Sequence, residues 1–141
     1  MSTEEVLQLC NNICQNTLMQ TLEIEFVSVD LKAETLTARM PVSPKVHQPD
    51  GVLHGGATAA LAESVGSAAC YVFLDAENFM IRGIEISANH LKSIREGDVF
   101  AIASFIHKGR TTQLWEIKVT DEDDNLISLC KLSTITLPKK K

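Results

Sequence analysis

Hydrophobic residues recur with two different periods along this chain, and the periods divide it into expected helices and strands. Between residues 4 and 19 the apolar positions recur every three or four residues, which predicts an amphipathic helix. From residue 23 to residue 42 the period shifts toward two, which predicts two strands with a hairpin turn at residues 30–34. Short polar turns then separate four more strand-like runs, at residues 81–91, 98–107, 111–120 and 126–137.

The stretch from residue 47 to residue 74 differs from both patterns. Its first third is rich in turn residues and ends in His54-Gly55-Gly56, and the remainder has no Pro, Lys or Arg, which predicts one long buried helix. Large apolar residues form one stripe of this helix, as packing on a sheet requires. The other side carries one carboxylate, Glu63, among the small residues Ala59, Ala60, Gly66 and Ser67. Because burial of a carboxylate is costly, a poorly solvated Glu63 is a candidate for chemistry.

These elements predict an α+β fold in a single domain that spans residues 1–141. Strands joined by short turns form antiparallel neighbours. We therefore expect one antiparallel sheet of about six strands, two before and four after the central helix, that curls around that helix. A chain of this length buries a sizeable core without disulfide or metal. The four scattered cysteines are expected to be reduced core thiols, since no second Cys/His pair follows Cys10 and Cys14 at metal-ligand spacing.

The charge and the N-terminus limit the class of partner. A net charge of −5 argues against nucleic acid or a membrane surface, because both are polyanionic and select an excess of Lys and Arg. The first ten residues contain two acids and neither a basic segment nor a long apolar run, and no run of about 18 apolar residues occurs elsewhere. We expect no signal peptide, no membrane span and a cytoplasmic location.

Three short motifs carry a resemblance to a known family. They are Gln48-x5-His54-Gly55-Gly56-x6-Glu63-Ser64-x2-Ser67, Ala88-Asn89-His90 and Gly109-Arg110-Thr111-Thr112. The chain resembles hotdog-fold acyl-CoA thioesterases of the phenylacetate-pathway type, especially the aryl-CoA and 1,4-dihydroxy-2-naphthoyl-CoA hydrolases and the enterobactin proofreading thioesterases. The resemblance covers residues 19–137. It implies the hotdog fold and an active site shared between two chains, usually in a dimer of dimers.

The chemistry of the same residues is compatible with this resemblance. Backbone N–H groups at the start of a helix lack intrahelical partners, so Gly55 and Gly56 offer donors to a carbonyl that develops negative charge. Glu63 is suited either to attack a thioester carbon or to take a proton from water, and the sequence leaves both routes open. Eight residues separate Gly55 from Glu63, about 12 Å along a helix, so a second chain is needed to bring both to one carbonyl.

The resemblance assigns roles to further residues. It implies that Gln48 and His54 contact or orient the thioester and the water, that Ser67 positions water near Glu63, and that Ser64 packs nearby. His90 would line the acyl or pantetheine channel. At strand ends and turns, four long cations are candidates for the anionic nucleotide of coenzyme A. They are Arg82, Lys92, Lys108 and Arg110.

The leading hypothesis is hydrolysis of an acyl- or aryl-CoA thioester, or of a carrier-protein thioester, without metal or redox cofactor; coenzyme A is then part of the substrate. Two alternatives stay open. One is a non-catalytic acyl-CoA-binding protein of the same fold, and the other is a hotdog dehydratase or hydratase, which is expected to use a different His and acid arrangement. The absence of a Gly-x-Ser-x-Gly elbow around Ser64 disfavours a serine hydrolase.

Overall fold

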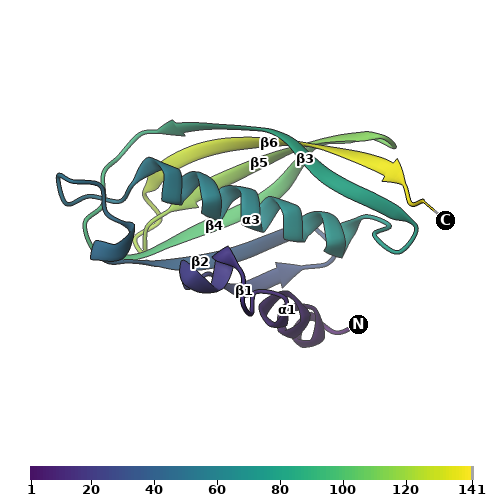
Figure 1. Ribbon diagram of the computed structural model, residues 1–141, viewed down its shortest axis with the longest axis horizontal. Coiled ribbons are helices and arrows are strands. Elements are labelled where there is room, and N and C mark those ends of the chain that lie inside the picture. The colour runs from purple at the N-terminus through teal and green to yellow at the C-terminus, as the bar shows by residue number, and fades with distance from the viewer. Residues whose placement is uncertain (141) are drawn as a thin grey trace.

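The computed structural model describes residues 1–140, and its six strands form one antiparallel sheet that curls around a long helix (Figure 1). The strands are β1 (Glu25–Asp30), β2 (Thr35–Val42), β3 (Phe79–His90), β4 (Gly97–Lys108), β5 (Thr112–Thr120) and β6 (Leu126–Pro138). The helices are α1 (Thr3–Asn12), α2 (Leu18–Thr21), the short 3-10 helix η1 (Pro44–Val46) and α3 (Gly55–Phe73). The expected α+β class and sheet-wrapped helix are confirmed.

The order of the strands differs from the expectation at one place. Along the sheet the order is β1-β2-β4-β5-β6-β3, so β3 pairs with β6 at one edge while β4 pairs with β2. The prediction that consecutive strands are neighbours is therefore wrong for β3 and β4. Their connection crosses the end of the sheet, where Leu91 N–H donates to Ile127 O at 2.8 Å and Leu53 N–H donates to Ile94 O at 2.8 Å. This crossing lies against the loop that precedes α3.

Helix α3 packs one face on the sheet and leaves the other face uncovered by any element of residues 1–140 (Figure 1). Leu61 and Val65 are fully buried in one core cluster with Trp115 and Leu132. Gly66 also faces the sheet, since a Cβ at this position would lie 2.5 Å from Leu132 Cδ2. The prediction that placed Gly66 with the small residues of the open side is wrong, because its missing side chain admits a leucine of β6.

The helix expected at residues 4–19 is divided into two. Helix α1 ends at Asn12, Asn16 has a φ of 61°, and the Thr17 hydroxyl accepts Met19 N–H as the cap of the short α2. A residue with positive φ cannot continue a right-handed helix, so the chain turns at Asn16. The apolar periodicity alone does not reveal this break.

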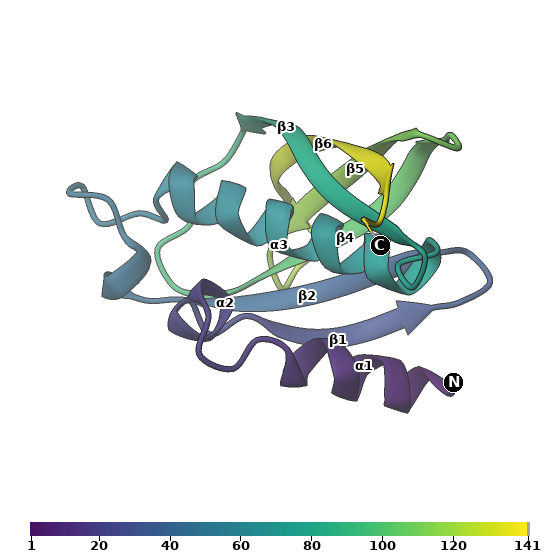
Figure 2. The same ribbon diagram turned by 45° about the vertical axis from the view of Figure 1, so that its right-hand side comes forward.

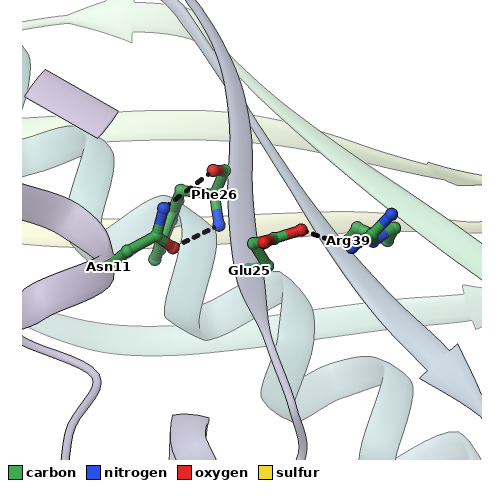
Figure 3. A network of polar contacts seen from close by, with 4 residues as sticks. All are labelled: Asn11, Glu25, Phe26 and Arg39. Atoms are coloured by element: carbon green, nitrogen blue, oxygen red, sulfur yellow. Dashed lines mark hydrogen bonds and ion pairs between the residues drawn. The ribbon is translucent and has the colours of Figure 1, made fainter. Parts of the chain in front are cut away.

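Helix α1 lies along the outer edge of β1 (Figure 2). The Asn11 side chain attaches it there, because its Oδ1 accepts Phe26 N–H at 2.7 Å and its amide donates to Phe26 O at 3.0 Å (Figure 3). Beside this contact, Arg39 and Glu25 form an ion pair between β2 and β1 (Figure 3). The amide contact satisfies backbone groups of an edge strand that would otherwise be open to another chain.

All four cysteines are free and buried, as expected. Burial raises the pKa of Cys10 to about 11, with a smaller contribution from the neighbouring Cys14. Among residues 1–140 no three His, Cys, Asp or Glu side chains gather in a way that could hold a metal ion. No helix in the described part of the chain is long and apolar enough to cross a membrane.

Candidate active site

The first turn of α3 leaves one backbone amide free. His54 is the N-cap, and its Nδ1 accepts Gly56 N–H at 2.7 Å. The N–H groups of Ala57 and Thr58 both donate to His54 O, at 3.0 Å and 3.2 Å. Gly55 N–H has no hydrogen-bond partner within residues 1–140. The expectation of two donors is therefore corrected to one, since Gly56 is engaged by the cap and Gly55 keeps the open amide at the positive end of the helix.

Imidazole rings stand directly over both glycines of this turn, so a side chain at either position would displace a ring. A Cβ at Gly56 would lie 2.8 Å from His54 Cε1, so the capping ring folds directly over this residue. A Cβ at Gly55 would lie 2.7 Å from Nε2 of His90, which comes from the end of β3. Packing of the two rings is thus a second reason for glycine at these two positions, in addition to access to the open amide.

A cavity of about 250 Å³ lies next to this turn. It is bounded by the loop before α3, the start of α3 and the crossing between β3 and β4, and four residues of the predicted site line it: Gln48, Gly55, His90 and Lys92. Gln48 is held in the loop by its own backbone, whose N–H donates to Val52 O at 2.8 Å. Its side-chain amide donates to Asp50 Oδ1 at 2.8 Å. The fold therefore gathers sequence-distant polar groups beside one free amide.

Glu63 lies on the uncovered face of α3 and is exposed in the single chain. The prediction of a poorly solvated carboxylate is wrong for one chain, because no element of residues 1–140 covers this face. Its Oε2 lies 3.3 Å from the position that a Cβ on Gly83 would occupy. Gly83 is on β3, beside a break in the register with β6. The carboxylate therefore leans over the edge strand of the sheet.

The neighbours of Glu63 on α3 are small and partly accessible. Ala59, Ala60 and Ser67 are half-buried. The Ser64 hydroxyl donates to Ala60 O at 2.6 Å, which uses its proton within the helix. The Ser67 hydroxyl, one helical turn after Glu63, makes no hydrogen bond within the described residues, so it stays available to a water or a substrate.

The four predicted cations lie in different places. Lys92 lines the cavity, whereas Arg82 and Arg110 are exposed and outside it. Lys108 Nζ lies 2.8 Å from Glu34 Oε2 and 5.2 Å from the centre of the Phe105 ring. It stands at the far end of β4, eleven residues or roughly 36 Å from the start of that strand near the cavity. Within one chain the structure brings Lys92 to the candidate site and leaves Lys108 engaged elsewhere.

Sequence reasoning missed two residues of this region, Ser128 and Gly83. Ser128 is a buried residue of β6 that is paired in register with His90, and its hydroxyl lies 3.0 Å from His90 Nδ1. Only the sheet order could have revealed this contact, because β3 and β6 are distant in sequence. Gly83 had a local signal, since an isolated glycine within a strand pattern often marks a bulge or a close approach.

Comparisons with known proteins agree with this geometry. Residues 50–128 match the model of the Thioesterase superfamily. The 1,4-dihydroxy-2-naphthoyl-CoA hydrolase of Escherichia coli is 38% identical over 93% of this chain and 94% of that protein. The proofreading thioesterase EntH of Cronobacter turicensis is 39% identical over 93% of each chain. A mutant thioesterase of Pseudomonas aeruginosa has a similar crystal structure, with a TM-score of 0.90, 40% identity and 94% of each chain covered. The chain therefore belongs to the thioesterase superfamily, and it is a thioester hydrolase with the hotdog fold.

Proposed function

We propose that this enzyme hydrolyses acyl- or aryl-thioesters of coenzyme A at a site built from the Gly55 amide of one chain and Glu63 of a second copy. The observation that supports this most directly is the Gly55 N–H at the start of α3, which has no partner within residues 1–140 and lies beside a cavity lined by Gln48 and His90. A thioester oxygen that accepts this N–H becomes more negative as the carbon is attacked, and the helix end stabilises that charge.

In this proposal each half-site makes a different contribution. Removal of one oxyanion-hole donor from an enzyme lowers kcat by about 10²–10³, because such donors are already oriented before the reaction begins. On one route Glu63 adds to the thioester carbon, the thiolate of coenzyme A leaves, and water then cleaves the mixed anhydride to release the acid and the free carboxylate. On the other route Glu63 removes a proton from water, which adds to the carbon as the thiolate leaves. Ser67 is proposed to hold the water near Glu63, with Ser64 packed beside it.

His54 can offer the substrate a hydrogen-bond donor from Nε2, whereas its Nδ1 is occupied by the helix cap and cannot act as a base. Because Nδ1 accepts Gly56 N–H, the neutral ring carries its proton on Nε2. We propose that this Nε2–H and the Gln48 side chain contact the thioester or the water. Gly56 does not act as the second donor that the sequence predicted. Its role is to leave space for the His54 ring.

The second copy is proposed from two features of α3 and β3. Helical rise separates Gly55 from Glu63 by about 12 Å, too far for one carbonyl to contact both. The edge strand β3 is twelve residues long and mostly exposed, and Ile84 on this strand and Tyr71 on α3 are 59% and 55% exposed. A two-fold related copy that pairs along β3 would cover these apolar residues, shield Glu63 and bring it toward the partner's helix start. A dimer of dimers stays our expectation for the full assembly.

Coenzyme A is the proposed carrier because the relatives at 38% and 39% identity include a CoA hydrolase and a proofreading thioesterase. Lys92, Arg82 and Arg110 are the proposed contacts of its phosphates. A carrier-protein thioester is the alternative substrate, and an aryl group is our first expectation for the acyl part. We also propose that hydrolysis needs no metal or redox cofactor and takes place in the cytoplasm. The thioesterase relatives argue against a non-catalytic binding protein and against a dehydratase.

Release of free thiol from a panel of thioesters tests the proposal. The parent, Glu63→Gln and Glu63→Ala should be compared on benzoyl-, acetyl- and long-chain acyl-CoA. We expect both variants to lose about 10²–10⁴ in kcat, because each lacks the carboxylate that acts as base or nucleophile. Equal rates in the parent and Glu63→Ala would show that the assignment of Glu63 is wrong.

Mixed subunits test whether the site is shared. Variants Glu63→Ala and His54→Ala each disable a different half-site, so a dimer that contains one of each keeps one complete site and one doubly disabled site. After unfolding and refolding an equal mixture, we expect about a quarter of the parental sites to be intact. Mass spectrometry of tagged subunits confirms that mixed dimers form. Mixed dimers without activity would refute the shared site.

A further inference from the structure

The imidazole of His90 is held from behind by a buried hydroxyl. His90 Nδ1 lies 3.0 Å from Ser128 Oγ, and Ser128 is fully buried in the neighbouring strand β6. The same hydroxyl donates to Asn89 O at 3.0 Å, and it lies 3.7 Å from the Cys130 thiol. Ser128 therefore joins the end of β3 to β6 through both backbone and ring.

The proton count at Ser128 determines which nitrogen of His90 carries hydrogen. A hydroxyl has one proton, whereas a carbonyl oxygen can only accept, so the contact with Asn89 O uses that proton. The contact with His90 then requires Nδ1–H to donate to Ser128 Oγ, and the second lone pair of this oxygen can accept the Cys130 thiol. For a neutral ring this is the arrangement that satisfies all these contacts, and it leaves Nε2 as a hydrogen-bond acceptor.

The acceptor nitrogen points at the candidate site. Nε2 lies 2.7 Å from the position of a Cβ on Gly55, so it stands beside the residue whose amide is free. His90 also lines the cavity of about 250 Å³, together with Gln48 and Lys92. A thioester carbonyl bound to Gly55 N–H would therefore have the acceptor nitrogen of His90 next to it. His54, by contrast, presents a donor.

We propose that His90 Nε2 accepts a hydrogen bond from an O–H or N–H group of the substrate close to the thioester carbonyl, and that Ser128 is the positioning residue that fixes this tautomer. The proposal rests on thioester hydrolysis at the Gly55 amide. Two substrate groups have the required chemistry. One is a hydroxyl on the acyl part next to the thioester, as in a 2-hydroxyaroyl group, and the other is the nearest amide N–H of the pantetheine arm.

Nitrogen NMR tests the tautomer independently of activity. At about pH 8.5, well above the ordinary pKa of histidine, ¹⁵N–¹H correlation spectra distinguish the two neutral tautomers. We expect His90 with its proton on Nδ1, and His54 and His47 with theirs on Nε2, because His47 Nε2 donates to Arg95 O at 2.8 Å. Ser128→Ala should shift His90 toward the other tautomer. The control Ser133→Ala, on the same strand, should leave it unchanged. A proton on Nε2 of His90 in the parent would overturn the proposal.

Substrate pairs test recognition and distinguish its two sources. The first pair is 2-hydroxybenzoyl-CoA and benzoyl-CoA, with 4-hydroxybenzoyl-CoA as control. The second is the benzoyl thioester of N-acetylcysteamine, which keeps one amide, and that of ethanethiol, which has none. In the parent we expect kcat/KM to favour the donor-bearing member of one pair by about tenfold, the effect of one hydrogen bond. That preference should vanish in His90→Leu, fall in Ser128→Ala and persist in His90→Gln, which keeps an acceptor.

The outcomes separate this proposal from the function on which it rests. A His90-dependent preference in the first pair identifies the acyl hydroxyl as the donor, and one in the second pair identifies the pantetheine amide. An active parent whose preferences do not change in His90→Leu overturns recognition by His90 and leaves thioester hydrolysis standing. A parent that hydrolyses none of these thioesters overturns the proposed function and recognition by His90 together.

Discussion

Substitution of His54 tests whether one side chain both starts helix α3 and contacts the substrate. Its Nδ1 accepts Gly56 N–H at 2.7 Å, and its backbone has the extended conformation of an N-cap, with φ −68° and ψ 130°. His54→Ala removes the cap, which costs about 1 kcal/mol. For a chain of this size that loss corresponds to a fall of about 4 °C in melting temperature. The same variant loses the Nε2–H that is proposed to contact the thioester.

His54→Asn separates the two roles. Asn is among the best N-cap residues, and its Oδ1 can accept Gly56 N–H, but it has no group in the place of the imidazole Nε2–H. We expect its melting temperature to lie within about 1 °C of the parent. Its kcat/KM should fall about ten- to a hundredfold, as in His54→Ala, because the donor to the substrate is lost in both.

Calorimetry and thiol-release kinetics on the two variants check this pair of predictions. Far-UV circular dichroism confirms that both variants fold. If His54→Asn melts as low as His54→Ala, the capping argument is wrong. If His54→Asn keeps the parental kcat/KM, the proposed contact between His54 and the substrate is wrong.

Three further predictions follow from the same contacts. In Gly83→Ala the new Cβ would lie 3.3 Å from Glu63 Oε2, so the carboxylate must move by a few tenths of an ångström; we expect kcat to fall roughly three- to tenfold while the melting temperature stays near that of the parent. Lys92→Ala should raise KM for CoA thioesters about threefold and not for N-acetylcysteamine thioesters, whereas Lys108→Ala should change neither, because its ammonium is paired with Glu34. Dialysis against a chelator should leave the hydrolysis rate unchanged, and a loss of activity that zinc or magnesium restores would contradict hydrolysis without a metal.

The secondary structure was largely predictable because alternation and helical spacing are local signals. The hairpin turn at residues 30–34 and the strand from Thr112 to Thr120 agree with the expected ranges. The position of β3 was not predictable, since a six-residue connection is long enough either to turn back or to cross the end of the sheet. The break at Asn16 depends on one backbone angle that asparagine tolerates and that periodicity does not show.

The candidate site was predictable in its components but not in its contacts. Spacing placed Gly55 at a helix start and Glu63 about 12 Å away along the same helix. Spacing could not show that His54 would occupy the Gly56 amide, because capping depends on the rotamer of the ring. The orientation of Gly66 was also undetermined, since a residue without a side chain reads as small on either face of a helix.

The two glycines of the His-Gly-Gly motif lie under the rings of two histidines of opposite hydrogen-bonding character. His54 folds over Gly56 and keeps its proton on the outer nitrogen, so it presents a donor. His90 approaches Gly55 from another strand and, in the tautomer fixed by Ser128, presents an acceptor. His90 lies beside Gly55 and His54 over the next residue, and neither ring accepts the Gly55 N–H within residues 1–140. An amide left open in this way can polarise a carbonyl while the two neighbouring rings distinguish the groups attached to that carbonyl.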